Sequence, residues 1–280
     1  MTRSSRDDLR DLITEVVSSF KEDSRVWLLE SPEPRVLNEG VYDPGILKAV
    51  FTAGGPGSGK SFMADVVFGV RDDKNKKIFQ KASFVGATGL KYVNSDLLFE
   101  KGLAAAGINP KLLAQISQEN PDLWDYIQDP TDPDSIRSVA KRKLGKLRGF
   151  YEGSRLGLLI DGTGKNYMKI EKDKKKLEDL GYDTSMLFVD TNLPVAIERD
   201  EARDRTLGKE KVTELWTQVR KNKDRLASLF GDNYQVVENS EYGPPPEEVI
   251  KKIDNFVSGP IKNPIGQDWV RHQIEQKNRK

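Results

Sequence analysis

Short runs of apolar residues alternate along this chain with longer stretches whose apolar residues recur every three or four positions. The short runs read as buried strands and the longer stretches as helices. Strands are predicted at residues 47–52, 91–93, 156–160, 185–190 and 234–238. Helices are predicted at residues 62–70, 97–106, 135–153, 167–180, 194–206, 211–230 and 246–257. Because such alternation forms parallel βαβ units, we predict an α/β fold, a mainly parallel sheet between two layers of helices.

The chain extends beyond this alternating core at both ends. Residues 8–20 carry apolar side chains at helical spacing, and a proline-containing stretch follows, so residues 1–45 are predicted to form a helix and linker that pack on the core. The core domain is predicted at residues 46–258. Residues 259–280 form a polar tail, with its charged last part either frayed or helical on the surface.

Two segments inside the core interrupt the alternation. Residues 71–81 form a charged insertion after the first helix. Residues 109–133 are broken by Pro110, Pro121, Pro130 and Pro133, which predicts short helices and turns.

A glycine-rich loop lies between the first strand and the first helix and fits the phosphate-binding pattern G-x-x-x-x-G-K-[ST] at every fixed position. Its residues are Gly54, Gly55, Pro56, Gly57, Ser58, Gly59, Lys60 and Ser61. Glycines let backbone N–H groups converge on phosphate oxygens, and the helix N-terminus favours negative charge. Lys60 would reach the β- and γ-phosphates and Ser61 would hold Mg²⁺, so the loop predicts binding of a nucleoside triphosphate.

Asp161 directly follows a buried apolar run, as the magnesium-binding aspartate of such proteins does. Ligands of parallel sheets bind at the carboxyl ends of strands, so Asp161 can meet the phosphate loop there. The alternative is a structural role, because a strand-end aspartate can also cap the next helix or turn.

Two features disfavour hydrolysis and GTP. The residue after Asp161 is Gly162, where ATPases that hydrolyse for work commonly place a glutamate to activate water. Residues 222–225 resemble the guanine-reading pattern Asn-Lys-x-Asp, but the fourth position is Arg225 and the segment lies inside a predicted helix. Transfer to a bound acceptor is therefore favoured.

Asp96 is the candidate general base, since it follows the second strand and a carboxylate there can orient an acceptor hydroxyl and accept its proton. The alternative is an N-cap for the helix that begins at residue 97. Asn94 or Ser95 could cap that helix equally well, so the cap role does not need Asp96.

Three arginines, Arg199, Arg203 and Arg205, lie in a short charged segment that ends near Gly208. Arginines on a lid neutralise charge on the transferred phosphoryl group. The alternative is a solvated helix with local ion pairs such as Glu201 with Arg205.

The helix predicted from residue 135 is strongly basic. Its candidate nucleic-acid contacts are Arg137, Lys141, Arg142 and Arg148. The alternative is a solvated basic face, because a run of charge is common on exposed helices.

Composition narrows the chemistry further. The chain has 280 residues, a net charge of +1, no cysteine and one histidine, His272. Thiol catalysis and cysteine-based zinc sites are excluded, and a histidine-based site is disfavoured. No apolar run approaches the length needed to cross a bilayer, so we expect no membrane partner and a cytoplasmic location.

Together, the phosphate loop at residues 54–61, Asp96 in its Asn-Ser-Asp setting, Asp161-Gly-Thr-Gly and the arginine segment resemble the zeta-toxin and polynucleotide-kinase branch of P-loop kinases. The resemblance spans residues 47–257. Residues 180–199 are similar to predicted kinases of large bacteriophages, some of whose relatives phosphorylate hydroxymethyluracil in DNA during base modification. The resemblance to the zeta-toxin and polynucleotide-kinase branch implies a P-loop NTPase fold with a helical lid at about residues 199–212. It also implies ATP and Mg²⁺ as cofactors, Asp96 as base and lid arginines on the phosphates.

The sequence thus predicts an ATP-dependent kinase whose acceptor is a hydroxyl of a nucleic acid or nucleotide. A hydroxymethylpyrimidine in phage DNA, reached in the host cytoplasm, or a polynucleotide end fits best. One alternative is a zeta-toxin-like kinase of a UDP-sugar or another small molecule. Another is a nucleotide-gated binding protein without transfer chemistry.

Overall fold

The computed structural model describes residues 41–68, 88–203, 206–241 and 243–279. The predicted helix at residues 8–20, the insertion at residues 71–81 and Arg205 lie outside the described residues. The chain divides into two compact units. We call them the sheet unit, Glu39–Asn94 with Leu144–Lys280, and the helical unit, whose described part is Ser95–Lys143.

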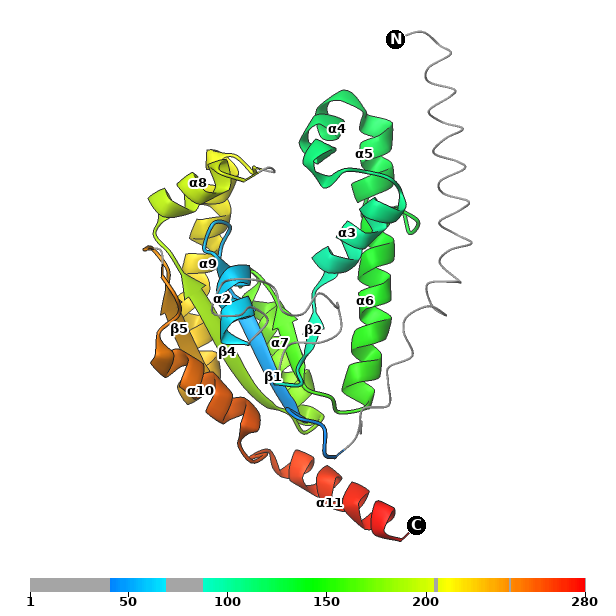
Figure 1. Ribbon diagram of the computed structural model, residues 1–280, viewed down its shortest axis with the longest axis vertical. Coiled ribbons are helices and arrows are strands. Elements are labelled where there is room, and N and C mark those ends of the chain that lie inside the picture. The colour runs from blue at the N-terminus through cyan, green and yellow to red at the C-terminus, as the bar shows by residue number, and fades with distance from the viewer. Residues whose placement is uncertain (1–40, 69–87, 204–205, 242, 280) are drawn as a thin grey trace. The chain divides into compact units, whose positions relative to one another are not determined.

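Five strands form a parallel sheet in the order β2-β3-β1-β4-β5 (Figure 1). They are β1 (Lys48–Ala53), β2 (Lys91–Val93), β3 (Leu158–Asp161), β4 (Asp183–Asp190) and β5 (Tyr234–Glu238). The register pairs Thr52 with Asp161 on one side of β1 and with Leu187 on the other. The carboxyl ends of β1 and β3 are therefore level, as a shared ligand site requires.

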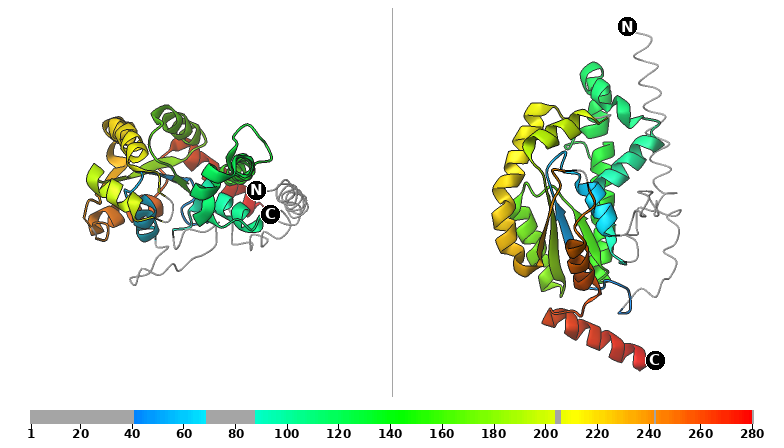
Figure 2. Two further views of the ribbon diagram at one scale, coloured as in Figure 1. Left: turned by 90° about the horizontal axis from the view of Figure 1, so that it is seen from above. Right: turned by 60° about the vertical axis from the view of Figure 1, so that its left-hand side comes forward.

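Helices cover both faces of this sheet. The sheet unit contains α2 (Lys60–Val67), α7 (Tyr167–Asp179), α8 (Leu193–Glu201), α9 (Lys209–Phe230), the 3₁₀ turn η2 (Gly231–Asn233), α10 (Glu247–Ser258) and α11 (Pro264–Asn278). Successive strand side chains point to opposite faces. Phe51 and Phe188 pack with α7 and α9, whereas Val50 and Leu187 pack with α2 and α10. Figure 2 shows α2 and α9 on opposite sides of the strands. The predicted three-layer α/β fold is confirmed.

The helical unit has a small core of its own. It consists of α3 (Ser95–Ala105), the 3₁₀ turn η1 (Pro110–Leu112), α4 (Leu113–Glu119), α5 (Pro121–Gln128) and the start of α6 (Ile136–Gly153), which continues into the sheet unit. Phe99, Leu103, Ile127 and Ile136 are buried together. Asn109 and Asn120 cap the turn and helix that begin at the following prolines, which explains the short elements predicted there.

The structure differs from the sequence prediction at the end of α8, and it shows the tail in the helical one of the two forms predicted for its last part. Helix α8 ends at Glu201 rather than at residue 206, because Asp200 accepts hydrogen bonds from the backbone of Leu207 and Gly208 and so closes the following segment. The tail is helical from Pro264, and its Trp269 packs against the sheet core. Within the part of the chain that the structure describes, the helices are all too short or too polar to cross a bilayer.

Candidate phosphate-binding site

The glycine-rich loop leaves the central strand β1 and enters α2, as the pattern predicts. Gly57 and Gly59 have φ angles of 72° and 75°, a region that glycine adopts without strain. A Cβ on Gly57 would overlap the Ala196 carbonyl, and one on Gly59 would overlap the Asn239 side chain. Glycine is therefore required at both positions. A glycine loop between a parallel strand and a helix gives the α/β architecture of a P-loop NTPase.

Lys60 and Asp161 form an ion pair where the phosphate loop meets the end of β3. Their side chains are 12% and 13% exposed, so water screens the pair only in part. The Asp161 carboxylate also accepts hydrogen bonds of 2.8 Å from Thr52 Oγ1 and from Asn94 Nδ2. Two predicted functional residues are thus brought together, with a cation and a carboxylate held at one strand edge.

Asn94 also contacts a second, half-buried side chain, that of Tyr92. Its Nδ2 lies 3.0 Å from the hydroxyl oxygen of Tyr92. Burial raises the pKa of Tyr92, and the nearby Asp161 carboxylate raises it further, because both disfavour a phenolate. Tyr92 therefore stays a neutral phenol at physiological pH. Sequence reasoning considered Asn94 for helix capping and missed its contact with Asp161.

The oxygen donors at this edge suit Mg²⁺. Ser61 is exposed in the first turn of α2, and Asp161 supplies a carboxylate at the end of β3. Magnesium ions are usually bound by one or two carboxylates together with substrate phosphates. Among the described residues, no group of three or more His, Cys, Asp or Glu side chains is placed to hold a metal ion.

The carbonyl groups of the loop are bound from the side of β5 and α8. Asn239 Nδ2 donates to Ser58 O at 2.7 Å, and Arg199 Nη1 lies 3.5 Å from Gly57 O. The same Arg199 atom donates to Asn239 O at 2.7 Å. These contacts join the phosphate loop to segments more than 140 residues away along the chain. No pattern in the sequence marks Asn239 for this role.

The remaining lid arginines lie in the segment between α8 and α9. Arg203 is exposed there, and Arg205 lies outside the described residues. Asp200, which is 1% exposed, accepts hydrogen bonds from Leu207 N at 2.7 Å and Gly208 N at 3.2 Å. The two ends of the arginine segment are thereby tied together, and its predicted contact with phosphate stays a prediction.

Asp96, the candidate base, belongs to the helical unit. It lies in the first turn of α3, and its carboxylate is 2.7 Å from Arg137 Nη1. The Asp96 side chain is 68% exposed, while Arg137 lies over the ring of Phe99. An exposed carboxylate with a fixed cationic partner is accessible to an acceptor hydroxyl, and its role as base stays a prediction.

The basic residues of α6 have different surroundings. Arg142 donates to Pro133 O, and Arg148 pairs with Glu152 and Asp173, whereas Lys141 is exposed. Burial alone would lower the pKa of Arg148, but the carboxylates of Asp173 and Glu152 outweigh it and raise that pKa. The structure therefore gives Arg142 and Arg148 partners within the chain, as it does Arg137, and leaves nucleic-acid binding by this helix a prediction.

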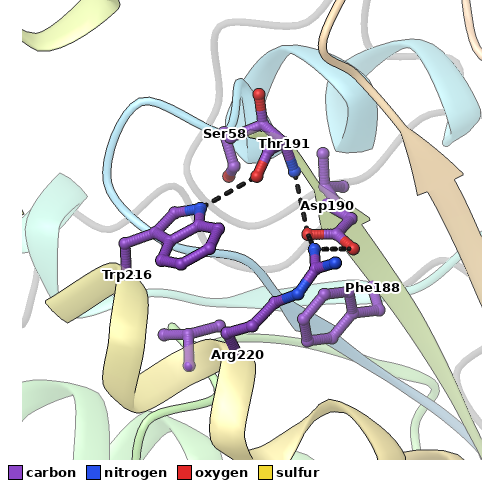
Figure 3. Close-up of a pocket in the computed structure, with 9 residues that line it drawn as sticks. Ser58, Phe188, Asp190, Thr191, Trp216 and Arg220 are labelled. Atoms are coloured by element: carbon purple, nitrogen blue, oxygen red, sulfur yellow. Dashed lines mark hydrogen bonds and ion pairs between the residues drawn. The ribbon is translucent and has the colours of Figure 1, made fainter. Parts of the chain in front are cut away.

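A small pocket lies beside the phosphate loop, between the end of β4 and helix α9 (Figure 3). Trp216 Nε1 donates to Thr191 O at 2.8 Å, and Arg220 Nη1 donates to both oxygens of Asp190 at 2.8 and 2.6 Å. Ser58 lines the same pocket and is 1% exposed. These contacts fix α9 against the end of β4 beside the phosphate loop, and the sequence carried no signal for them.

Asn222 lies within α9, as its helical setting predicted. Its side chain donates to Gly164 O and Lys165 O, both at 2.9 Å, and so holds the loop that follows Asp161. The next residue, Lys223, pairs with Asp190. Both side chains have structural partners within the chain, which agrees with the argument against a guanine-reading motif.

No protein-family model matches this sequence, and no curated protein matches it. Solved structures are similar over most of the chain. One is the PezAT chromosomal toxin-antitoxin system of Streptococcus pneumoniae, with 15% identity, 94% of this chain and 96% of that chain covered, and a TM-score of 0.45. Another is a gluconokinase from Sinorhizobium meliloti 1021, with 12% identity, coverage of 82% and 98%, and a TM-score of 0.39. A sugar kinase from Janibacter sp. HTCC2649 has 15% identity, coverage of 78% and 97%, and a TM-score of 0.36. The likeness is weak, so the fold rests on this chain's own sheet and phosphate loop.

Proposed function

We propose that this protein is an ATP-dependent kinase that transfers the γ-phosphate of ATP to a hydroxyl group. The pairing of Lys60 with Asp161 at the phosphate loop is the observation that supports the proposal most. It provides a cation for the phosphates and a carboxylate for Mg²⁺, which are the parts that phosphoryl transfer requires. Gly162 follows in place of a glutamate that would activate water, which favours transfer over hydrolysis.

Each predicted residue has a role in this reaction. The loop N–H groups and Lys60 bind the triphosphate, and Ser61 and Asp161 would hold Mg²⁺, which when bound neutralises phosphate charge. Asp96 accepts the proton of the acceptor hydroxyl while the new O–P bond forms and the bond from the γ-phosphorus to the bridging oxygen breaks. Arg203 and Arg205 stabilise the charge on the transferred group. Such positioning suffices without a covalent intermediate.

The acceptor we propose is a nucleic acid or nucleotide, either a hydroxymethylpyrimidine in phage DNA or a polynucleotide end. The exposed Lys141 and the sequence resemblance at residues 180–199 support it. A UDP-sugar is the second candidate acceptor, supported by the resemblance of the phosphate loop, Asp96 and Asp161 to the zeta-toxin branch.

Transfer of labelled γ-phosphate from ATP to a panel of acceptors tests this proposal. The panel contains plain DNA, hydroxymethyluracil-containing DNA, RNA 5′-ends and UDP-N-acetylglucosamine. We expect label in one of the nucleic acids and a rate roughly 100-fold lower in Asp96→Asn, with ATP binding retained. Label in UDP-N-acetylglucosamine would show that the proposed acceptor is wrong, while the proposed kinase activity would stand.

The matched control is Asp122→Asn, because Asp122 also lies in the first turn of a helix of the helical unit. It should transfer phosphate at the wild-type rate. ATP binding without label in any acceptor would contradict the proposal and favour a nucleotide-gated binding protein.

A further inference from the structure

Arg199 and Asn239 act on the phosphate loop from outside its sequence motif. They come from α8 and from the end of β5, and together they bind two successive carbonyl groups of the loop. We propose that these two residues form a carbonyl clamp that sets the loop in its phosphate-binding shape, so that Arg199 is a positioning residue rather than a contact of the transferred phosphoryl group. The proposal rests on the proposed function for the identity of the ligand as ATP.

The amide of Asn239 is the centre of this clamp. Asn239 is 4% exposed, and its Nδ2 donates to Ser58 O at 2.7 Å. A peptide unit is planar and trans, so its C=O and N–H groups point in opposite directions. Fixing the Ser58 carbonyl toward Asn239 therefore turns the N–H of Gly59 to the other side, where a phosphate oxygen would accept it.

The backbone around Asn239 fixes its side chain in turn. Asn239 N donates to Asp190 O at 2.8 Å, while its own carbonyl accepts from Arg199 Nη1 at 2.7 Å and from Thr191 Oγ1 at 3.2 Å. A buried amide held at this many points has little freedom to move away from Ser58. The phosphate loop is thus supported by the ends of β4 and β5 in addition to β1.

Arg199 closes the clamp from α8. Its Nη1 reaches both Gly57 O and Asn239 O, at 3.5 and 2.7 Å. A guanidinium with two carbonyl partners is oriented by the protein itself. Arg203 lies in the segment that follows α8, and its side chain is exposed. Arg199, in contrast, is held by the carbonyl groups of Gly57 and Asn239. The two arginines therefore have separable tasks, one on the loop and one toward substrate.

Binding of MgATP to purified full-length variants tests the clamp. We expect Asn239→Ala and Arg199→Ala each to raise the Kd for ATP by roughly tenfold, because each leaves a loop carbonyl without its donor. The double variant should fall well short of the hundredfold product, since the two residues contact each other and bind successive carbonyl groups of one loop. At saturating ATP, kcat should stay within roughly threefold of wild type in both single variants.

The matched control is Asn233→Ala. Asn233 lies at the opposite end of β5 and also donates its Nδ2 to a backbone carbonyl, Thr184 O at 3.1 Å. It should lower the melting temperature about as much as Asn239→Ala while leaving the Kd for ATP within twofold of wild type. An equal loss of affinity in the control would show general destabilisation and overturn the clamp.

Two other results would also overturn it. If the Kd for ATP is unchanged in both Asn239→Ala and Arg199→Ala, the two residues do not set the phosphate-binding shape of the loop. A large fall of kcat in Arg199→Ala, with the Kd for ATP unchanged, would make Arg199 a contact of the transferred group. Wild type that binds ATP and transfers nothing would instead contradict the proposed kinase and leave the clamp standing.

Discussion

Two aspartates end the strands on either side of β1, and their surroundings differ. Asp161 at the end of β3 pairs with one cation, Lys60 of the phosphate loop, and with the neutral donors Thr52 and Asn94. Asp190 at the end of β4 is 4% exposed and binds two cations of one helix, Arg220 and Lys223. The first pairing joins two parts of a ligand site, and the second fixes α9 to the sheet.

This difference shows how two strand-end aspartates of one sheet, Asp161 level with Thr52 and Asp190 three residues beyond that level, take on separate tasks. A single lysine on a loop can exchange its carboxylate for phosphate when a ligand arrives, so Asp161 becomes available to Mg²⁺. Two cations of one helix hold Asp190 from the same side, and removing the carboxylate would remove the ion-pair partner of both. We therefore propose that Asp161 serves chemistry, whereas the ion pairs of Asp190 serve structure.

Replacing the two lysines should break the comparison most clearly. Lys60→Ala should lower phosphate transfer by roughly 100-fold to 1,000-fold, because it removes a charge aimed at the transferred group. Lys223→Ala, which removes the corresponding partner of Asp190, should leave the rate within a few-fold. Steady-state transfer assays of both variants measure this difference. Similar rates in the two variants would contradict the assignment of Lys60 to phosphate transfer and of Lys223 to structure.

The aspartates themselves should separate activity from stability. Asp161→Asn should lower the transfer rate by roughly 100-fold with a small change in the free energy of unfolding. Asp190→Asn should reduce the free energy of unfolding by about 2 kcal/mol, because it removes a buried carboxylate that pairs with two cations. The loss is limited because Arg220 and Lys223 can still be solvated by water. Urea unfolding beside transfer assays measures both. The account fails if Asp190→Asn loses transfer at unchanged stability.

A smaller effect is expected at Thr52, which holds Asp161 through one hydrogen bond of 2.8 Å. Thr52→Val keeps the shape of the side chain and removes the donor. The transfer rate should fall by roughly fivefold, as the loss of about 1 kcal/mol of positioning implies. Thr52→Ser, which keeps the hydroxyl, serves as the control and should retain most of the rate.

The smallest effect is expected at a third carboxylate, that of Glu152 in the last turn of α6, which pairs with Lys176 of α7 and serves as an example of a structural ion pair. Burial alone would raise the pKa of Glu152, but hydrogen bonds from Lys176 and Arg148 outweigh it and lower that pKa below its ordinary value of 4.5. A lowered pKa in the folded state means stability that is present above pH 4.5 and lost as the pH falls through the folded pKa.

Glu152→Gln should therefore lower the free energy of unfolding at pH 7, and the difference from wild type should shrink as the pH falls below 4.5. Urea unfolding at several pH values measures this. A difference that grows at low pH would contradict the pairing. Phosphate transfer at pH 7 should be unchanged.

Local sequence predicted the parts that depend on neighbouring residues. Strand β5 and the setting of the phosphate loop follow from apolar runs and glycines, so both were placed from sequence. Asn239 and Trp216 reach the loop from distant segments, and the distinction between Asp161 and Asp190 depends on which helix supplies their cations. Those contacts arise from the folding of the sheet, and a single sequence contains no local pattern for them.

The most direct test of the central claim is transfer of labelled γ-phosphate from ATP by wild type, Asp161→Asn and Asp190→Asn, assayed side by side on the same acceptor panel. The account predicts label in one acceptor with wild type, a rate roughly 100-fold lower with Asp161→Asn and a near wild-type rate with Asp190→Asn below its melting temperature. Bound ATP with no label transferred to any acceptor by wild type, or equal rates in the two variants, would contradict it.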